Sequence, residues 1–491
     1  MSDILVLVVL LPLLSGLAAL GCRDRRGLVW TMTLGGVLGV AAAAAAALGP
    51  SGAGVFGGAL HLDALSRVLL LVVGGVGALS TVDSFVHWRG ELALGGPHLI
   101  QVGRGLPRVR TYFFWQQAFL ACLLLAAASG NLGVSWVAIE LTTVTSAVLV
   151  GLGGGARAVE AAWKYVVLCS VGLALALVTV LVLYALGGGG GLPALNWSAL
   201  EAAAAHFPPG PAKLAYLFAL VGLGTKAGLA PVHTWLPDAH SEAPAPISGL
   251  LSGVLLATVL CTLARVASIT AQVTGAAFPY HLLLGAGLLS VAVATPFLML
   301  QEDLKRLLAY SSLEQVGLMA VGFGLHVPLA AVGAVLQLVV HALTKSGLFF
   351  TAGQVVHDAG TQRLARLRGV GRHAPLLGAG LLIGIFTLGG LPPFGLFFSE
   401  LDILRAALAT SPWIGLGLFG LLAAIFGGLV YYVGNAVLGP GRPFVPTRAG
   451  ATTWAVVGLP VLLALVVGLW TPHALSGGLQ AAASVVLGGR Q

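Results

Sequence analysis

Charged residues are scarce in this chain. Only 8% of its 491 residues are charged and 58% are hydrophobic, whereas soluble globular domains carry about 25% charged residues. This composition excludes an ordinary soluble domain and indicates a protein that crosses a lipid bilayer many times. The net charge of +8 is therefore attributed to basic loops at one membrane face, and no nucleic-acid partner is expected.

Cysteine is also rare, and its placement excludes the common cysteine-based sites. The four cysteines are widely spaced, lie in or beside apolar runs and form no Cys-x-x-Cys pair: Cys22, Cys122, Cys169 and Cys261. This pattern provides no iron–sulfur cluster, zinc site or disulfide framework. A glycine-rich phosphate-binding loop of the P-loop type is missing too. We therefore expect neither a cofactor nor a metal ion in this chain.

Long apolar runs dominate what is present. About fourteen segments are long and apolar enough to span a bilayer. They are predicted to be helices, giving an all-α fold, because a helix satisfies its own backbone hydrogen bonds in lipid. The segments are 3–21, 28–48, 64–86, 111–129, 132–152, 163–186, 213–235, 246–269, 281–300, 306–325, 328–356, 377–402, 412–438 and 452–472. No signal-peptide cleavage pattern follows residues 4–20, so this run is expected to remain as a span.

The distribution of basic residues predicts the orientation of the spans. With the N-terminus outside, the inner loops hold 17 of the 24 lysines and arginines, and the outer side holds 5. The positive-inside rule then predicts a multi-pass protein of the cell inner membrane with both termini outside the cytoplasm. The two remaining basic residues, Lys226 and Lys345, fall inside predicted spans.

Five of the ionisable residues within predicted spans or near their ends indicate a relay. They are Glu140, Lys226, His341, Lys345 and Glu400. A charge at the centre of a bilayer costs at least ~2.5 kcal/mol, and a desolvated lysine can gain and lose a proton near neutral pH. Lys226, beside a predicted helix break, therefore indicates a proton relay. The alternative is that a side chain is interfacial and reaches the headgroups, and it stays open above all for Glu400.

Glycine and proline interrupt two of the predicted spans. Span 213–235 is broken at Gly228 and Pro231, and span 377–402 is broken over residues 389–395. Because the breaks are five spans apart, they predict two five-helix repeats, and the odd number of spans inverts the second repeat, as in many transporters. The alternative is a simple proline kink in a packed helix. The expected divisions are three N-terminal spans with a basic loop, the two repeats, and a C-terminal span with a tail: 1–110, 111–270, 271–440 and 441–491.

Motifs between about residues 111 and 404 carry a family resemblance. The most specific is TKAGLAPVHTWLPDAHSEAP at 225–244, and the others lie at 131–140, 162–170, 303–312 and 341–346. Through these motifs the chain resembles the antiporter-like, proton-translocating subunits of respiratory complex I and of the related membrane-bound hydrogenases. It is most similar to the F component of hydrogenase-4.

The resemblance implies a role for each residue of a proton relay. The implied relay residues are Glu140, Lys226, His233, His341, Lys345 and Glu400. Glu140 is expected to pair with Lys226, the broken-helix lysine, within salt-bridge or one-water distance. His341 corresponds to the relay residue of the eleventh span, and Glu400 to the terminal ionisable residue of the twelfth. His233 is expected to line the cytoplasmic access to the relay.

Two positions depart from the pattern of complex I. Ala257 stands where many relatives have a lysine in the eighth span, and Gln315 where some have a histidine in the tenth. Waters, Ser252, Thr258 or Lys345 bridge the gap that these two positions leave in the proton relay, or else the relay is weakened there. The chain also stops soon after the last span, so the long lateral helix of the distal complex I subunit is not expected.

These features together predict a subunit that moves protons, or alternatively sodium, within a redox-driven complex while holding no redox centre itself. Other membrane subunits and a peripheral, hydrogenase-like iron–sulfur arm are the implied partners. A first alternative is a subunit of a multi-subunit cation/proton antiporter or of an ion-coupled bicarbonate-uptake complex. A second alternative is a membrane scaffold that conducts no ions.

Overall fold

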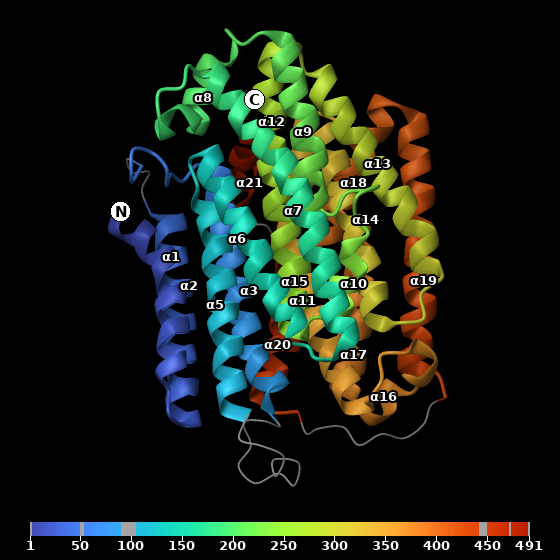
Figure 1. The fold of residues 1–491 in the computed structure, drawn as a ribbon. Helices are drawn as coiled ribbons and strands as arrows, with labels where there is room; N and C mark the ends of the chain where they lie inside the picture. The colour runs from blue at the N-terminus through green and yellow to red at the C-terminus, as the bar shows by residue number, and fades with distance from the viewer. Residues whose placement is uncertain (1, 50–53, 90–104, 441–448, 471–472, 490–491) are drawn as a thin grey trace.

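The computed structural model describes residues 2–49, 54–89, 105–440, 449–470 and 473–489. Within these ranges the chain forms helices joined by turns, with isolated bridges but no sheet, which confirms the predicted all-α fold (Figure 1). Four basic residues that were counted for the orientation lie outside the described residues: Arg104, Arg442, Arg448 and Arg490.

The helices follow one another along the chain with mostly short connections. In order they are α1 (Ser2–Gly21), α2 (Arg25–Leu48), α3 (Ala64–His87), α5 (Gly105–Ala128), α6 (Leu132–Gly151), α7 (Gly155–Leu186), the 3₁₀ turn η2 (Leu192–Leu195), α8 (Trp197–Ala204), α9 (Pro209–Ala227), α10 (Trp235–Glu242), α11 (Ala245–Leu250), the π-helical turn η3 (Leu251–Leu255), α12 (Leu256–Thr274), α13 (Ala277–Met299), α14 (Leu304–Gly324), α15 (Pro328–Ala359), the 3₁₀ turn η4 (Leu364–Arg366), α16 (Val370–His373), α17 (Pro375–Leu388), α18 (Gly395–Thr410), α19 (Pro412–Leu438), α20 (Ala451–Leu469) and α21 (His473–Val486).

Eleven helical segments of the described residues are long and apolar enough to cross a membrane. The other predicted spans, 213–235, 306–325 and 377–402, correspond to α9 with α10, to α14, and to α17 with α18. These three are interrupted or carry several charged residues, so length and composition alone do not identify them. The chain is a polytopic integral membrane protein, as predicted, while the count of fourteen spans stays a prediction.

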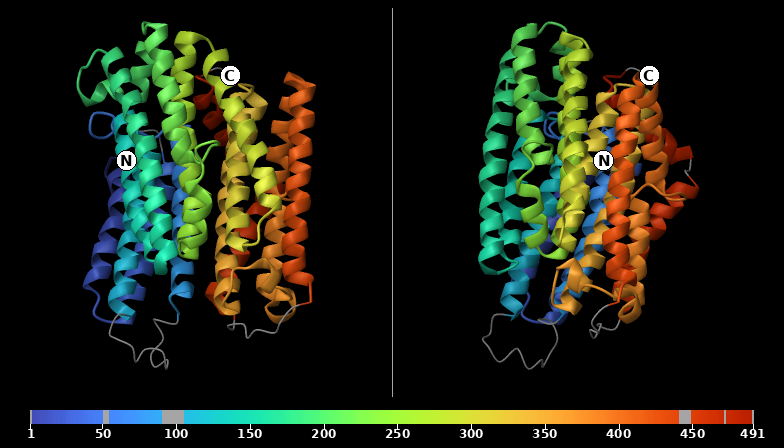
Figure 2. Two further views of the ribbon diagram at one scale, coloured as in Figure 1. Left: turned by 45° about the vertical axis from the view of Figure 1, so that its right-hand side comes forward. Right: turned by 90° about the vertical axis from the view of Figure 1, so that its right-hand side faces the viewer.

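The long helices stand side by side in one bundle. In Figure 2 the teal and green helices α5 to α9 form one group, and the yellow to orange helices α13 to α19 form another beside it. The segment from α11 to α12 is fully buried, and α15 contacts α3, α11, α14, α17, α18, α20 and α21. Polar residues on α12 and α15 are therefore shielded from lipid. The inverted relation of the two repeats and their boundaries stay predictions.

Both predicted helix breaks are present. Helix α9 ends where Gly228 adopts a left-handed conformation with φ +79°, and the N–H of Leu229 donates to the carbonyl of Gly224 at 2.8 Å. A β-carbon on Gly228 would lie 2.5 Å from Leu236 Cδ1, so both conformation and space require glycine here. At the second break Gly390 has φ +65°, between the end of α17 and the start of α18.

One end of the bundle, the lower end in Figure 1, is called the basic end because the α1–α2, α6–α7, α13–α14 and α15–α17 connections lie there, with arginines in or close to them. Near the opposite end the C-terminal helix α21 packs on α3, α12 and α15, and its Val486 carbonyl accepts a hydrogen bond from Tyr280 at 2.6 Å. The sequence predicted only a tail after the last span, because 14 residues are too few to span a bilayer.

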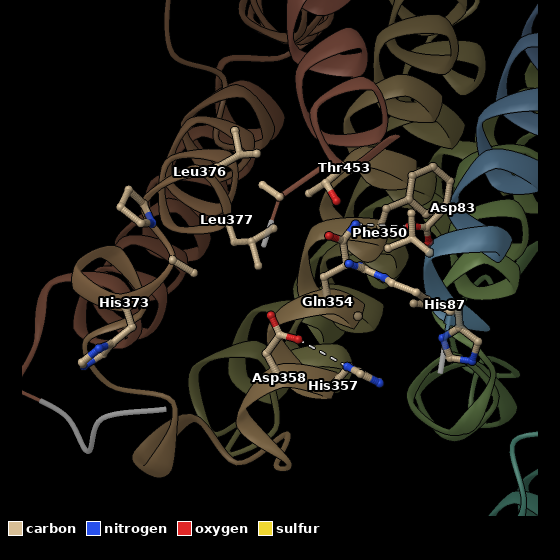
Figure 3. A pocket seen from close by; sticks show the side chains of 17 residues that line it. Asp83, His87, Phe350, Gln354, His357, Asp358, His373, Leu376, Leu377 and Thr453 are labelled. Carbon is tan, nitrogen blue, oxygen red and sulfur yellow. Dashed lines mark hydrogen bonds and ion pairs between the residues drawn. The ribbon is translucent and has the colours of Figure 1, made fainter. Parts of the chain in front are cut away.

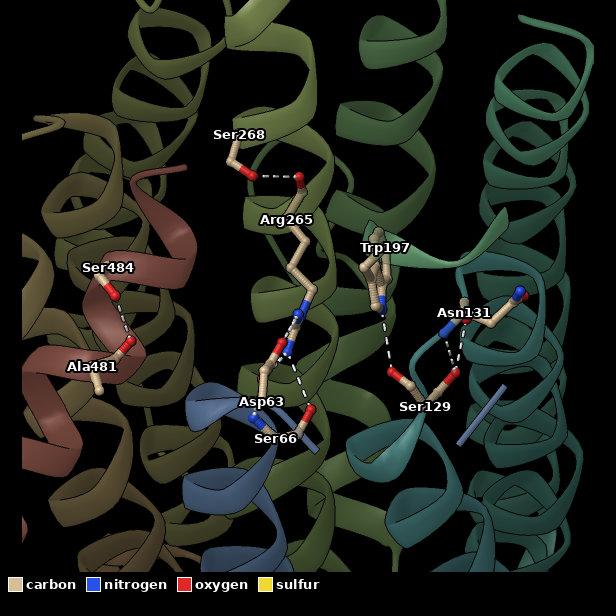
Figure 4. Close-up of polar contacts among 9 residues, drawn as sticks. All are labelled: Asp63, Ser66, Ser129, Asn131, Trp197, Arg265, Ser268, Ala481 and Ser484. Atoms are coloured by element: carbon tan, nitrogen blue, oxygen red, sulfur yellow. Dashed lines mark hydrogen bonds and ion pairs between the residues drawn. The ribbon is translucent and has the colours of Figure 1, made fainter. Parts of the chain in front are cut away.

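A buried ion pair joins α3 to α12 near this opposite end (Figure 4). Arg265, counted from the sequence on the outer side, lies inside α12 and binds both carboxylate oxygens of Asp63, with one distance of 2.8 Å. It also donates to Ser66 at 3.2 Å and lies 5.5 Å from the ring of Trp197. Burial alone would raise the pKa of Asp63, but the Arg265 charge and the hydrogen bonds hold that pKa below its usual range.

Breaking this pair from one side should destabilise the protein more than removing both charges. Asp63→Asn keeps the helix cap on Ser66 but leaves the guanidinium buried without a counter-charge. The cost should fall below the roughly 3–5 kcal/mol of a fully buried pair, because the Asp63 side chain is 27% exposed. In thermal unfolding of the solubilised protein, Asp63→Asn should lower the Tm more than Asp63→Asn/Arg265→Gln. Equal losses would mean that the charges do not interact.

Candidate functional site

The ionisable residues predicted from the sequence gather in two clusters, one near each helix break. The first cluster, on α6, α7 and α9, consists of Glu140, Thr143, Ser146, Tyr165, Ser170 and Lys226. The second cluster, on α14, α15 and α18, consists of Ser311, Glu314, Gln315, Gln337, Lys345, Ser399 and Glu400. The fully buried α11–α12 segment and α15 separate the two.

Lys226 is the centre of the first cluster. It is 0% exposed and lies one residue before the end of α9. Its ammonium donates to Thr143 Oγ1 at 2.8 Å and to the hydroxyl of Tyr165, whose ring centroid lies 4.5 Å away. Tyr165 in turn shares a 2.7 Å hydrogen bond with Ser146. The lysine is thus hydrogen-bonded by neutral hydroxyl groups.

Glu140 does not touch this lysine directly. Its Oε1 accepts from Ser170 Oγ at 3.1 Å, and its buried Oε2 has no hydrogen-bond partner among the described residues. No ion pair within 4.0 Å joins Glu140 to Lys226 in the described structure. The predicted salt bridge is therefore absent from the described structure, in which two of the three ammonium N–H groups donate to Thr143 and Tyr165; the one-water separation stays a prediction.

Trp235 fixes the segment that follows Lys226. Its indole N–H donates to the carbonyl of Thr225 at 2.8 Å, and the same carbonyl also accepts from the backbone N–H of Gly228 at 3.1 Å. Its ring lies 4.7 Å from that of Tyr165. His233, in the same connection, is 7% exposed, and its Nδ1 has no partner in the described part of the chain. The role of His233 at the cytoplasmic access stays a prediction.

His240 lies between the clusters and was missed in the sequence, although it belongs to the most specific motif. It is fully buried on α10, with its ring 6.1 Å from Trp235 and 5.8 Å from Phe349. Its Nδ1 hydrogen-bonds the carbonyl of the preceding turn at 2.8 Å, while Nε2 has no partner among the described residues. Because Phe349 is one turn after Lys345, His240 faces the approach to the second lysine.

Lys345 and His341 lie four residues apart on α15 but contact different helices. Lys345 is 0% exposed and donates to Ser311 Oγ at 2.5 Å and to the Leu308 carbonyl at 2.6 Å, both on α14. His341 lies 3.3 Å from the carbonyl of Ser252, within the π-helical turn η3. Such turns are frequent at functional positions in helices.

Of the two hydroxyl residues near Ala257, only Ser252 forms a hydrogen bond to another helix. Ser252 Oγ lies 2.7 Å from Ser312 Oγ and so connects η3 to α14, as the sequence suggested. Thr258, however, donates to Val254 of its own helix at 2.8 Å, and Ala257 is 1% exposed. Hydration of this region stays a prediction.

Glu314 is a second residue that the motifs did not single out. It is 1% exposed, one turn after Ser311 on α14, and its Oε2 has no partner among the described residues. A carboxylate inside the apolar run 306–325 is the sequence signal that could have identified Glu314 as a buried ionisable residue, but only its neighbour Gln315 has a counterpart in the family pattern. The Gln315 amide nitrogen lies 3.1 Å from Glu314 Oε1 and 3.3 Å from Glu400 Oε1, so it joins the two carboxyl groups.

Glu400 lies directly against the second helix break. A β-carbon on Gly390 would stand only 2.1 Å from Glu400 Oε2. Gln337 and Ser399 complete the string, since Ser399 donates to Gln337 and Gln337 donates to Gln315. The half-buried Glu400 is thus held by protein groups at the break, which argues against the alternative that it simply reaches the headgroups.

A charged cleft of about 560 Å³ opens at the basic end beside α10. Lys164 pairs with Glu160 at 2.7 Å and with Asp238 at 3.2 Å, and Arg306 also binds Asp238. Because His240 lies on the inner side of the same short helix, the cleft brings solvent within one helix diameter of the buried groups.

Buried ionisable groups at two helix breaks define a class of protein, the polytopic ion-translocating membrane subunits. The chain belongs to the NADH:quinone oxidoreductase/Mrp antiporter transmembrane family, whose model matches residues 129–427. It is 36% identical over 368 residues to a hydrogenase-4 component F homolog of Methylacidiphilum infernorum, covering 74% of this chain and 76% of that protein. The predicted resemblance is confirmed.

Solved structures agree with this assignment at the level of the fold. A chain of respiratory complex I from Thermus thermophilus with bound NADH superposes with a TM-score of 0.83 at 25% identity, covering 99% of this chain and 100% of that one. A chain of the Mrp complex from Dietzia sp. DQ12-45-1b superposes with a TM-score of 0.85 at 19% identity, covering 99% and 98%.

Gly390→Ala should disturb the terminal carboxylate without unfolding the bundle. The new methyl group would displace Glu400, and the left-handed conformation would cost about 1–2 kcal/mol. We expect a several-fold lower rate of proton pumping by the intact complex in sealed vesicles. Gly417→Ala on α19, where a β-carbon meets nothing within 4 Å, is the matched control. Normal proton pumping by both variants would show that the position of the Glu400 carboxylate does not affect transport.

Proposed function

We propose that this chain translocates protons as a subunit of a redox-driven membrane complex, along a lateral row of groups that begins at Glu140 and ends at Glu400. The family membership supports the antiporter-like role. The row itself is inferred from the geometry of the two clusters. A hydrogenase-like iron–sulfur arm as the redox partner is inferred from the resemblance to hydrogenase-4 component F.

One observation carries the proposal. Lys226 and Lys345 each donate to a hydroxyl that is one helical turn from a carboxylate. Lys226 donates to Thr143, one turn after Glu140, and the lysine of the second cluster donates to Ser311, one turn before Glu314. One turn is about 5.4 Å along the axis, so a lysine can exchange a neutral partner for a charged one by a small movement.

This exchange supplies a means to move charge. Unit charges 4 Å apart attract by ~4 kcal/mol at an effective dielectric near 20, which corresponds to about a thousandfold change in proton affinity. When a lysine meets its carboxylate, the bound proton is retained; when it returns to its hydroxyl, the proton is released. When the Glu140–Lys226 pair opens or closes, the change in charge would then act through His240 on Lys345 and its carboxylate.

The ends of the row support contacts with neighbouring membrane subunits. Around Glu140 the surface of α6 is apolar, with Val137 46% and Val144 50% exposed, and Phe398 is 40% exposed beside Glu400. A neighbour seated on either edge could change the charge state of the carboxylate there. The basic end is assigned to the cytoplasm and the protein to the inner membrane, on the strength of its arginine-rich loops.

A cation/proton antiporter without a redox arm is the second candidate, favoured by the fold similarity to the Mrp chain. Both candidates use the same row of groups. Purification of the intact complex would decide, because nickel-site and iron–sulfur subunits would be present only in the first.

Replacement of Lys226 should abolish pumping. Lys226→Ala leaves Glu140 without its partner, and Lys226→Arg should not rescue because a guanidinium stays protonated at working pH. We expect loss of at least about tenfold in proton pumping by assembled complex in sealed vesicles. Full pumping by the arginine variant would show that this side chain does not exchange its proton.

Replacement of Glu314 should also slow pumping, since it removes the carboxylate that faces Lys345 while keeping the hydrogen bond to Gln315. Glu314→Gln should lower the pumping rate several-fold. Asp402→Asn, which changes a half-buried carboxylate of α18 outside the second cluster, should pump like the unmodified complex. Equal rates for all three proteins would remove Glu314 from the route.

A further inference from the structure

A second cavity at the basic end is not part of either cluster or of the charged cleft. It has a volume of about 220 Å³ and lies between α3, α15, α17 and α20 (Figure 3). Its ionisable lining residues come from α3, α15 and α16 and from the second residue after α3: Asp83, His87, Arg89, His357, Asp358 and His373. Three histidines at one cavity are notable, because histidine exchanges protons readily near neutral pH.

Asp83 forms the inner end of this cavity. It is 2% exposed, and its one hydrogen bond in the described structure comes from the Gln354 amide at 3.3 Å. No lysine, arginine or histidine of the described residues lies within 4.0 Å of its carboxylate oxygens. One neutral amide does not compensate a buried carboxylate, so Asp83 needs a proton, a cation or water from the cavity.

A polar ladder begins one residue from Asp83 and leads into the protein. Ser84 bonds Tyr112 at 2.9 Å and Gln116 at 3.1 Å. Gln116 donates to Ser80 Oγ at 2.9 Å, and Ser80 donates to the backbone carbonyl of residue 246 at 2.9 Å. The ladder thus ends on α11, directly after the helix that carries His240.

The inner end of the ladder approaches the route proposed above. Two residues beyond the carbonyl that accepts from Ser80, Ser248 donates to the backbone of His240 at 2.8 Å. On the other side of the cavity, Phe350 lines the wall, and its neighbour Phe349 contacts His240 at 5.8 Å between ring centroids. The ladder therefore ends close to the backbone of His240, and the charged cleft borders the same short helix.

We propose that this cavity is a second proton inlet from the basic end, in which the histidines collect protons at the mouth and Asp83 receives them at the inner end. The inlet rests on the proposed proton translocation but uses a different path from the charged cleft. A proton passes from water in the cavity to the Asp83 carboxylate, with no bond formed or broken other than those to the proton.

The first test measures access. In a variant without the four native cysteines, Gln354→Cys should react with a membrane-impermeant, positively charged thiol reagent added at the basic end. Thr351→Cys is the matched control, one turn away on α15 and 1% exposed. We expect Gln354→Cys to react at least about tenfold faster than the control, from this side alone. Equal reaction rates would overturn the inlet.

The second test measures transport by the intact complex in sealed vesicles. Asp83→Asn, and Gln354→Cys after reaction with the reagent, should each lower proton pumping at least about threefold, while Glu201→Gln on α8 should not. Normal pumping by Asp83→Asn, alongside loss in Lys226→Ala, would overturn the inlet and leave the proposed function standing. Normal pumping by Lys226→Ala would instead contradict the proposed function itself. If Asp83→Asn fails to assemble, the pumping rate of Gln354→Cys after reaction with the reagent still tests the inlet.

Discussion

The hydrogen bonds from Lys226 and Lys345 to hydroxyl groups are the interactions on which the rest of the structure depends. An ammonium in a lipid-shielded bundle must be hydrogen-bonded, yet a permanent salt bridge would hold its proton firmly. Thr143 and Tyr165 satisfy the hydrogen bonds of Lys226 without neutralising it. The carboxylate one turn away then decides how tightly the proton is bound. A lysine bonded only to carbonyls, or paired throughout, would not respond to its neighbour.

The helix breaks lie beside the two clusters of ionisable groups, at positions where an unbroken helix would satisfy all of its own backbone hydrogen bonds. At Gly228 the chain turns sharply just after Lys226, and Trp235 then donates a second hydrogen bond to the Thr225 carbonyl, which already accepts from Gly228. At Gly390 the absence of a β-carbon leaves the space that the Glu400 carboxylate occupies. Backbone freed in this way is stable in a membrane only inside protein or at a water-filled cavity. The first break is buried from Gly228 to Ala230, whereas Pro392 and Pro393 of the second break lie at the surface of this chain.

The sequence was sufficient for the all-α membrane fold, the two breaks and the family, because apolar runs, glycine–proline interruptions and isolated charges are local signals. It was not sufficient for the partners of those charges. Lys226 was expected against Glu140, but the hydroxyls that displace it come from α6 and α7, and no local pattern marks them as ligands. Glu314 and His240 were not predicted, because Glu314 adjoins Gln315 and His240 lies in the same motif as His233, and both of those positions have counterparts in the family pattern. Helix α21 carries too few residues to register as a span.

The short helices α10 and α11 lie where the proposed paths from the basic end meet. The charged cleft borders α10, the ladder from Asp83 ends on α11, and His240 faces α15 between them. Because α10 has 8 residues and ends before the span that begins at Ala245 with α11, this short helix can shift without disrupting that span. Such a shift would move His240 relative to Phe349 and thereby connect or isolate the second lysine. The segment is thus suited to admit protons toward one lysine while the other is closed.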